Sequence, residues 1–242
     1  MPQNDLSTGF IRRLRVREPE AWFELWEAFG PLLRAQLTRW GRGRVGYETV
    51  QDLSQDTFAA LSGAIDRHDP SRGVRFSTWL LAIARHALGD EMDRRSAGKR
   101  GGGQRPVPLE AVHDPESPVP GPDGDFERAV FEAKVMAALR AAKRECTFDE
   151  FGVFQMRVLE GQRGGAVAKA LGISEPTVSR RLAAVRERLR RHLVETFGKY
   201  SFTEEEWDEL SRNGLAPIPN KGGEAFDQAL AEIYHRVAGS TP

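Results

Sequence analysis

Positive side chains crowd one stretch of this sequence, residues 163–192, and they are the groups best suited to binding chemistry. They are Arg163, Lys169, Arg180, Arg181, Arg186, Arg188, Arg190 and Arg191. Only Glu175 and Glu187 oppose them within the stretch. A guanidinium group donates paired hydrogen bonds to phosphate oxygens and to the edge of guanine. The pattern therefore indicates a surface that binds nucleic acid.

The elements that must position these arginines are two helices joined by a tight turn. The first is expected over residues 166–171 and ends at Gly172, because glycine takes positive φ without steric cost. Ser174 is the expected N-cap of the second helix, and Glu175 and Pro176 suit its first turn. The positions that carry a helix-turn-helix spacing are Ala168, Gly172 and Val178. The expected shared core consists of Val167, Leu171, Ile173, Val178 and Leu182. An ordinary hairpin of two helices is the alternative, and the charge argues against it.

Two other chemistries are weakly indicated. His86 and Asp90 stand one helical turn apart and could hold a metal ion. No HExxH motif, glycine-rich phosphate loop or nucleophile motif accompanies them, so we expect no enzyme, no metal and no cofactor. Cys146 is the only cysteine, which excludes an intrachain disulfide and fits a reducing compartment.

The net charge of the whole chain conceals an uneven distribution of charge along it. The 242 residues carry 35 Lys and Arg against 35 Asp and Glu, a net charge of zero. The segment after residue 195 is acidic, in contrast to the basic stretch before it. The sequence shows neither a signal segment nor an apolar run of membrane-spanning length, so we expect a cytoplasmic protein without membrane insertion.

Helical periodicity dominates the sequence and predicts an all-α fold. Three tryptophans recur at helical spacing over residues 22–40, which favours a packed core over a ligand site, and Pro31 is expected to kink or divide this helix. Thr49 is the expected cap of the next helix. Residues 75–95 form a further helix. Residues 126–143 and 148–159 are also expected to be helical, as is most of the acidic extension.

Residues 101–125 are rich in proline and glycine, so we expect them to form a linker. We therefore predict two helical domains, at residues 1–100 and 126–194, and an acidic C-terminal extension at residues 195–242. The opposite charge of the extension suggests that it regulates, either by covering the basic face or by binding a partner.

Two stretches on either side of the linker together resemble the extracytoplasmic-function sigma factors of bacterial RNA polymerase. The first, FELWEAFGPLLRAQLTRWGRGRVGYETVQDLSQDTFAAL followed by FSTWLLAIARHALGDEMDRR, resembles region 2 of that family. The second, VLEGQRGGAVAKALGISEPTVSRRLAAVRERLRRHL, resembles region 4. The resemblance implies a dissociable polymerase subunit that recognises promoter −35 and −10 elements and directs transcription initiation.

The resemblance also implies a role for individual residues. Asp52, Gln55 and Asp56 would face the polymerase β′ clamp helices. The −10 DNA would lie near Phe76, Trp79, Arg85, His86, Arg94 and Arg95. The −35 DNA would lie near Ser174, Glu175, Thr177, Val178, Ser179, Arg180 and Arg181, with Arg186 and Arg188 on or near phosphates. Region 4 would also contact the β flap, and an anti-sigma factor or other regulator is a further expected partner.

Three points stay open at this level. Phe76 and Trp79 either stack on unpaired bases or belong to the core. Gly164 and Gly165 either start the first helix of the motif, at a cost of about 2 kcal/mol, or precede it. The alternative function is a conventional helix-turn-helix regulator that binds duplex DNA without polymerase.

Overall fold

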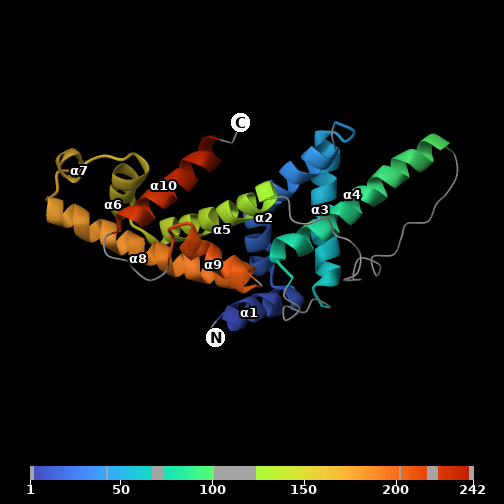
Figure 1. Cartoon of the computed structure of the whole chain (residues 1–242), viewed down its shortest axis with the longest axis horizontal. Coiled ribbons are helices and arrows are strands. Elements are labelled where there is room, and N and C mark those ends of the chain that lie inside the picture. The colour runs from blue at the N-terminus through green and yellow to red at the C-terminus, as the bar shows by residue number, and fades with distance from the viewer. Residues whose placement is uncertain are drawn as a thin grey trace. The chain divides into compact units, whose positions relative to one another are not determined.

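The structure is a computed structural model that describes residues 3–41, 43–66, 74–100, 124–201, 203–216 and 223–239. Every regular element in these ranges is a helix, as Figure 1 shows, so the all-α prediction is confirmed for them. The chain separates into two compact units, residues 2–130 and 131–242. The predicted linker lies outside the described residues except for its last two, Gly124 and Asp125, which begin α5 (Gly124–Glu145).

The first unit is built on α1 (Gln3–Arg15), α2 (Pro19–Gly41), α3 (Tyr47–Ala64) and α4 (Phe76–Arg100). Helices α2, α3 and α4 pack against one another. Each contributes one apolar stripe, and the fully buried members include Phe29, Leu33, Leu37, Leu61 and Leu80. The apolar stripe of α3 and its C-cap is buried throughout: Val50, Leu53, Thr57, Phe58, Leu61 and Ile65.

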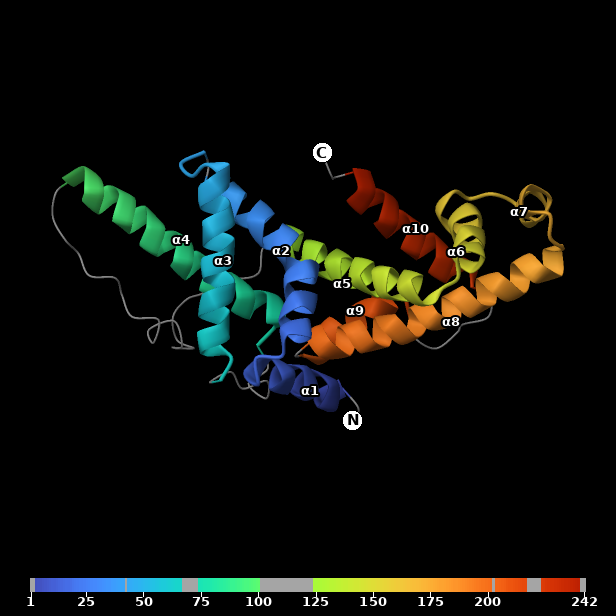
Figure 2. The same cartoon turned by 180° about the vertical axis from the view of Figure 1, so that it is seen from behind.

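One of two local predictions for this unit needs correction. Pro31 was expected to kink or divide α2, and α2 runs on as one element that bends along its course (Figure 2). The proline is exposed and its ring avoids the core, so the helix gives up one hydrogen bond without losing its packing. Thr49 does not cap α3: the N-cap is Gly46, which forms no side-chain bond, and the Thr49 hydroxyl instead accepts from Arg95 Nη2 at 2.7 Å.

The second unit holds the rest of α5 and the elements after it. These are α6 (Phe148–Phe154), the π-helix η3 (Gln155–Leu159), α7 (Gly164–Leu171), α8 (Glu175–Tyr200), α9 (Glu204–Arg212) and α10 (Glu224–Gly239). One hydrophobic cluster runs through it and includes residues of α9 and α10 such as Leu210, Phe226 and Ile233. The acidic extension is thus packed into the same core as α7 and α8.

Among the described helices, none combines the length and the apolar character that crossing a membrane requires.

Candidate nucleic-acid interface

Helices α7 and α8 form the predicted helix-turn-helix. Gly172 ends α7 with φ +65°, the left-handed conformation that glycine tolerates, and the Ile173 N–H bonds back to the Ala168 carbonyl at 3.0 Å. Ser174 caps α8 by accepting from the Thr177 N–H at 3.4 Å. Ala168 is buried, as a close helix contact requires. These predictions of turn chemistry are confirmed.

The predicted core of the motif is correct at most positions. Val167, Val178 and Leu182 are buried, and Ile173 is partly buried against the same cluster. Leu171 is the exception, because its side chain is 39 % exposed at the end of α7. It is the last residue of α7, immediately before the Gly172 turn, and lies at the surface.

The two glycines before the core lie inside α7, so the alternative that they precede the helix is wrong. The space they leave is used by Glu175: a methyl group on Gly165 would come within 2.9 Å of Glu175 Oε1. The carboxylate therefore lies beside the first turn of α7, where the helix dipole favours negative charge.

The start of α8 presents a polar surface. Ser174, Glu175, Ser179 and Arg180 are exposed, and Thr177 and Arg181 are half-buried. Arg180 donates to Thr177 Oγ1 at 3.2 Å, and Arg181 pairs with Asp149 at 3.3 Å. Val178, by contrast, is only 2 % exposed and supports the helix from the core side.

The arginines further along α8 have intramolecular partners. Arg186 forms a bidentate pair with Asp227 of α10, with Nε to Oδ1 at 2.9 Å. Arg188 bonds Glu150 at 3.1 Å and lies 3.7 Å from Cys146 Sγ. The Thr147 N–H and then Arg188 hold the pKa of Glu150 below its usual value. Burial raises the pKa of the Cys146 thiol, which keeps it neutral.

In the first unit, one face of α3 is acidic and open to solvent. Asp52, Gln55 and Asp56 are all exposed, opposite the buried stripe of the same helix. Their spacing of three and four residues places them on one side of α3. Among the described residues, neither Asp52 nor Asp56 pairs with a basic side chain, so this surface presents two uncompensated negative charges to solvent.

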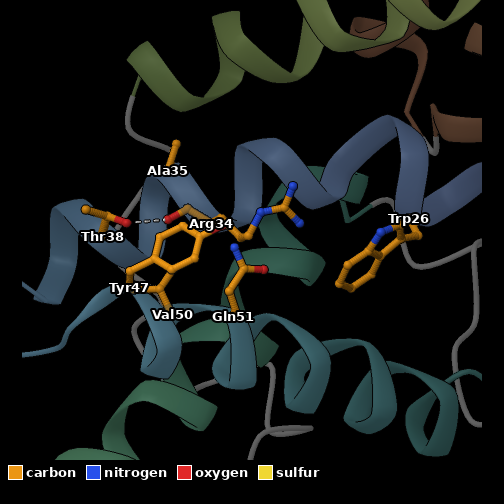
Figure 3. A pocket seen from close by; sticks show the side chains of 7 residues that line it. All are labelled: Trp26, Arg34, Ala35, Thr38, Tyr47, Val50 and Gln51. Carbon is orange, nitrogen blue, oxygen red and sulfur yellow. Dashed lines mark hydrogen bonds between the residues drawn. The ribbon is translucent and has the colours of Figure 1, made fainter. Parts of the chain in front are cut away.

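Next to this face, α2 and α3 enclose a shallow pocket of about 450 Å³. Figure 3 shows Trp26, Arg34 and Thr38 reaching it from α2, and Tyr47 and Gln51 from α3. The Arg34 guanidinium lies 5.5 Å from the centre of the Trp26 ring, a cation–π arrangement. The pocket thus combines aromatic surface with a positive group.

Helix α4 carries the other predicted DNA contacts, and several are tied to neighbours. Trp79 is 8 % exposed and belongs to the core, so in this conformation its ring is not open to stack on a base. Arg85 lies over the Trp40 ring at 4.6 Å, and His86 Nδ1 pairs with Asp90 at 3.1 Å. Arg94 is exposed and pairs with Glu91 at 3.0 Å.

Arg95 bonds Glu91 at 2.6 Å and the Arg44 carbonyl at 2.9 Å, in addition to Thr49. The side chain of Phe76 lies outside the described residues. Within the described part of the chain no group of three His, Cys, Asp or Glu could hold a metal ion.

Comparison with known proteins decides the family. The model for "Sigma-70 region 2" matches residues 25–98, which span α2, α3 and α4. The chain is 31 % identical over 142 residues to the "ECF RNA polymerase sigma factor SigC" of Mycobacterium tuberculosis, covering 58 % of this chain and 68 % of that protein. This chain belongs to the extracytoplasmic-function sigma factors. It is thus an RNA polymerase sigma factor that directs transcription initiation, and the family is not enzymatic.

Other relatives agree. The "Probable RNA polymerase sigma-C factor" of Mycobacterium bovis is also 31 % identical over 142 residues, with the same 58 % and 68 % coverage. The "Probable RNA polymerase sigma factor RfaY" of Xanthomonas campestris is 28 % identical over 155 residues, which cover 62 % of this chain and 36 % of that one. No solved structure matches. Membership of the family implies binding to core RNA polymerase and to promoter DNA.

Sequence reasoning missed the contacts that tie this sigma factor's extension to the unit that holds α8. Lys134 of α5 pairs with Glu206 of α9 at 3.2 Å, and both side chains are 1 % exposed. The partners lie 72 residues apart. The acidic residues after 195 gave a signal of opposite charge, but nothing in their spacing identifies which of them is buried.

Proposed function

We propose that three surfaces of this sigma factor divide the work of initiation. The exposed face of α3 docks on the β′ clamp helices, α4 contacts the −10 element, and the start of α8 reads the −35 element in the major groove. The unit that holds α8 also contacts the β flap. We propose the domain boundaries predicted above and a cytoplasmic site of action. An anti-sigma factor or another regulator stays a predicted partner.

The −35 assignment is supported by the geometry at the start of α8. A recognition helix enters the major groove N-terminus first, so the residues just after the cap reach base edges. Ser174, Glu175, Ser179 and Arg180 are exposed there. Within the described residues Arg180 bonds a threonine hydroxyl and no carboxylate, so its guanidinium keeps donors for a base or a phosphate. Arg186 and Arg188 stay predicted phosphate contacts, although each has a carboxylate partner in the free chain.

The −10 assignment is supported by charge on the outer side of α4. Arg94 and Arg95 are exposed, and Arg85 and His86 are half-buried. Trp79 is proposed to support this surface from the core rather than to stack on a base. Phe76 stays a predicted contact at the start of the helix.

The docking assignment rests on the single observation that Asp52, Gln55 and Asp56 share one exposed face while the opposite face of α3 is core. An acidic surface of this kind complements a basic partner and steers its association.

The first test is transcription by purified bacterial core polymerase on a pool of genomic promoter fragments, with and without this protein. We expect specific start sites that appear only with the protein and share upstream sequences at both −35 and −10. Arg180→Ala should change the preference at one base of the −35 element if that arginine reads it directly, or weaken all promoters alike if it binds phosphate. Start sites that share no −35 sequence would contradict the proposal that α8 reads the promoter.

The docking surface has a separate test. Asp52→Arg combined with Asp56→Arg should weaken assembly with core polymerase by roughly tenfold or more, since each exposed charge is reversed at the interface. Glu20→Arg, an exposed acidic position on α2, is the matched control and should assemble as the parent does. Unchanged circular dichroism would show that the fold is intact. Normal assembly of the double variant would mean that another face docks.

A further inference from the structure

Helix α10 meets α8 at Arg186. Asp227, in the first turns of α10, accepts from both Nε and Nη2 of that arginine, the first bond measuring 2.9 Å. The two side chains are only 20 % and 18 % exposed. Figures 1 and 2 both show the N-terminal end of α10 beside α8, while its other end points away. The pair is therefore a partly buried junction between the two helices.

The junction is tight and involves a second arginine. The Arg190 guanidinium lies over the Phe226 ring at 4.7 Å from its centre. A methyl group on Gly223, just before α10, would come within 2.8 Å of the Arg186 Cζ atom, so a side chain there would push the guanidinium out of its present position. Two successive turns of α8 thus place a guanidinium against the start of α10.

Arg186 lies on the side of α8 that is proposed to face DNA. It follows Ser179 by seven residues, which is two helical turns, so the two side chains leave the helix in nearly the same direction. Glu175 lies one turn before Ser179 on that side. The bidentate edge of a guanidinium fits a carboxylate and a phosphate alike, and the N–H groups bonded to Asp227 cannot bond a phosphate at the same time.

We propose that Asp227 occupies the phosphate-binding edge of Arg186, so that α10 competes with DNA and restrains binding by α8. The proposal rests on the proposed DNA-reading role of α8. It assigns the acidic extension a specific action through one carboxylate. Release of this pair adds one phosphate contact to the complex and makes binding both tighter and more sensitive to salt.

The test measures the affinity of the full chain for a short random-sequence DNA duplex by fluorescence anisotropy across a potassium chloride titration. Asp227→Asn should bind roughly fivefold more tightly, and the slope of log K against log salt should steepen by about 0.9. Glu224→Gln is the matched control: it removes the same charge from an exposed position three residues earlier in α10. Equal affinity and slope for the two variants would overturn the proposal.

Two further variants guard against indirect effects. Arg186→Lys keeps the net charge but loses the planar fork, so it weakens the pair with Asp227 and should also steepen the salt slope. If Asp227→Asn acts by freeing the arginine, Arg186→Ala should cost more affinity in the Asp227→Asn background than in the parent. An equal cost in both backgrounds, or no steepening in Arg186→Lys, would contradict the mechanism.

The variant Arg180→Ala distinguishes a failure of the proposed competition by Asp227 from a failure of the proposed DNA-reading role of α8. If Arg180→Ala weakens binding while Asp227→Asn matches its control, α8 binds DNA and only the competition fails. If Arg180→Ala leaves both this binding and the −35 preference in the transcription assay unaltered, the DNA-reading role of α8 fails first.

Discussion

At the scale of single residues, Glu150 joins two parts of the second unit. Its carboxylate accepts from the Thr147 N–H at 2.9 Å, which completes a capping box at the start of α6, and from Arg188 of α8 at 3.1 Å. The capping bond and then the arginine hold the pKa of Glu150 below its ordinary value of 4.5. Because the ionised form is the stabilised one, the unit gains stability wherever Glu150 is charged.

This coupling predicts a pH-dependent effect of Glu150→Gln. The stability that Glu150 contributes is complete above pH 4.5, its unfolded value, and is lost as pH falls through its lower folded pKa. The variant should therefore be about 1 kcal/mol less stable than the parent at neutral pH, and the difference should narrow as pH falls below 4.5 through the lower folded pKa. Thermal unfolding of both chains at each pH measures this. Asp149→Asn, which alters an exposed pair, should cost less than about 0.5 kcal/mol at any pH.

At the scale of elements, the sequence predicts a turn correctly where the required conformation is compatible with only a few residue types. Gly172 and Ser174 mark the boundaries of α7 and α8 because positive φ and N-capping each select few residues. The start of α3 was missed because Gly46 caps it without a side-chain bond, so its sequence carries no such signal. The exposed acidic face of α3 follows from helical periodicity alone, whereas the partners of Arg186 and Arg188 depend on long-range packing that periodicity does not encode.

Three glycines in the helix-turn-helix predict opposite effects of the same substitution. Gly164→Ala should stabilise the second unit by about 0.5–1 kcal/mol, because the nearest atom to its methyl group is Glu175 Oε2 at 4.0 Å. Gly165→Ala should gain less, since the Glu175 carboxylate has to move away. Gly172→Ala should cost about 1 kcal/mol or more at φ +65°. Urea unfolding gives the order, and a Gly172→Ala variant as stable as the parent would contradict the role of the turn.

The buried pair between α5 and α9 predicts a large loss of stability when one partner is replaced and a small loss when both are replaced. Glu206→Ala breaks the pair with Lys134, whose side chain is 1 % exposed, and should cost about 3–5 kcal/mol. Ser201, which the Lys134 ammonium contacts at 3.2 Å, cannot replace a charge. Replacing both members, Lys134→Met with Glu206→Gln, should recover most of the loss. Glu204→Gln, at an exposed position of α9, is the control for urea unfolding.

At the scale of the whole molecule, the acidic extension shares the hydrophobic core of the second unit. Acidic composition usually marks a solvated segment, and the sequence after residue 195 fits that rule on average. The structure departs from it because Leu210, Leu215 and Leu230 are completely buried in the cluster that also contains Val185 and Leu189 of α8. The extension is therefore part of the hydrophobic core that holds the helix-turn-helix in place.

This integration predicts what truncation after Ser201 does. Removing residues 202–242 exposes the apolar surface that Leu210, Phe226 and Ile233 cover and leaves Lys134 without Glu206, so the second unit should lose most of its stability. The first unit, whose core lies in α1 to α4, should keep its own. Hydrogen exchange read by mass spectrometry separates the two: protection should collapse in α5 to α8 and persist in α2 and α3. Full protection of α8 in the truncated chain would show that the extension is not needed for the stability of the second unit.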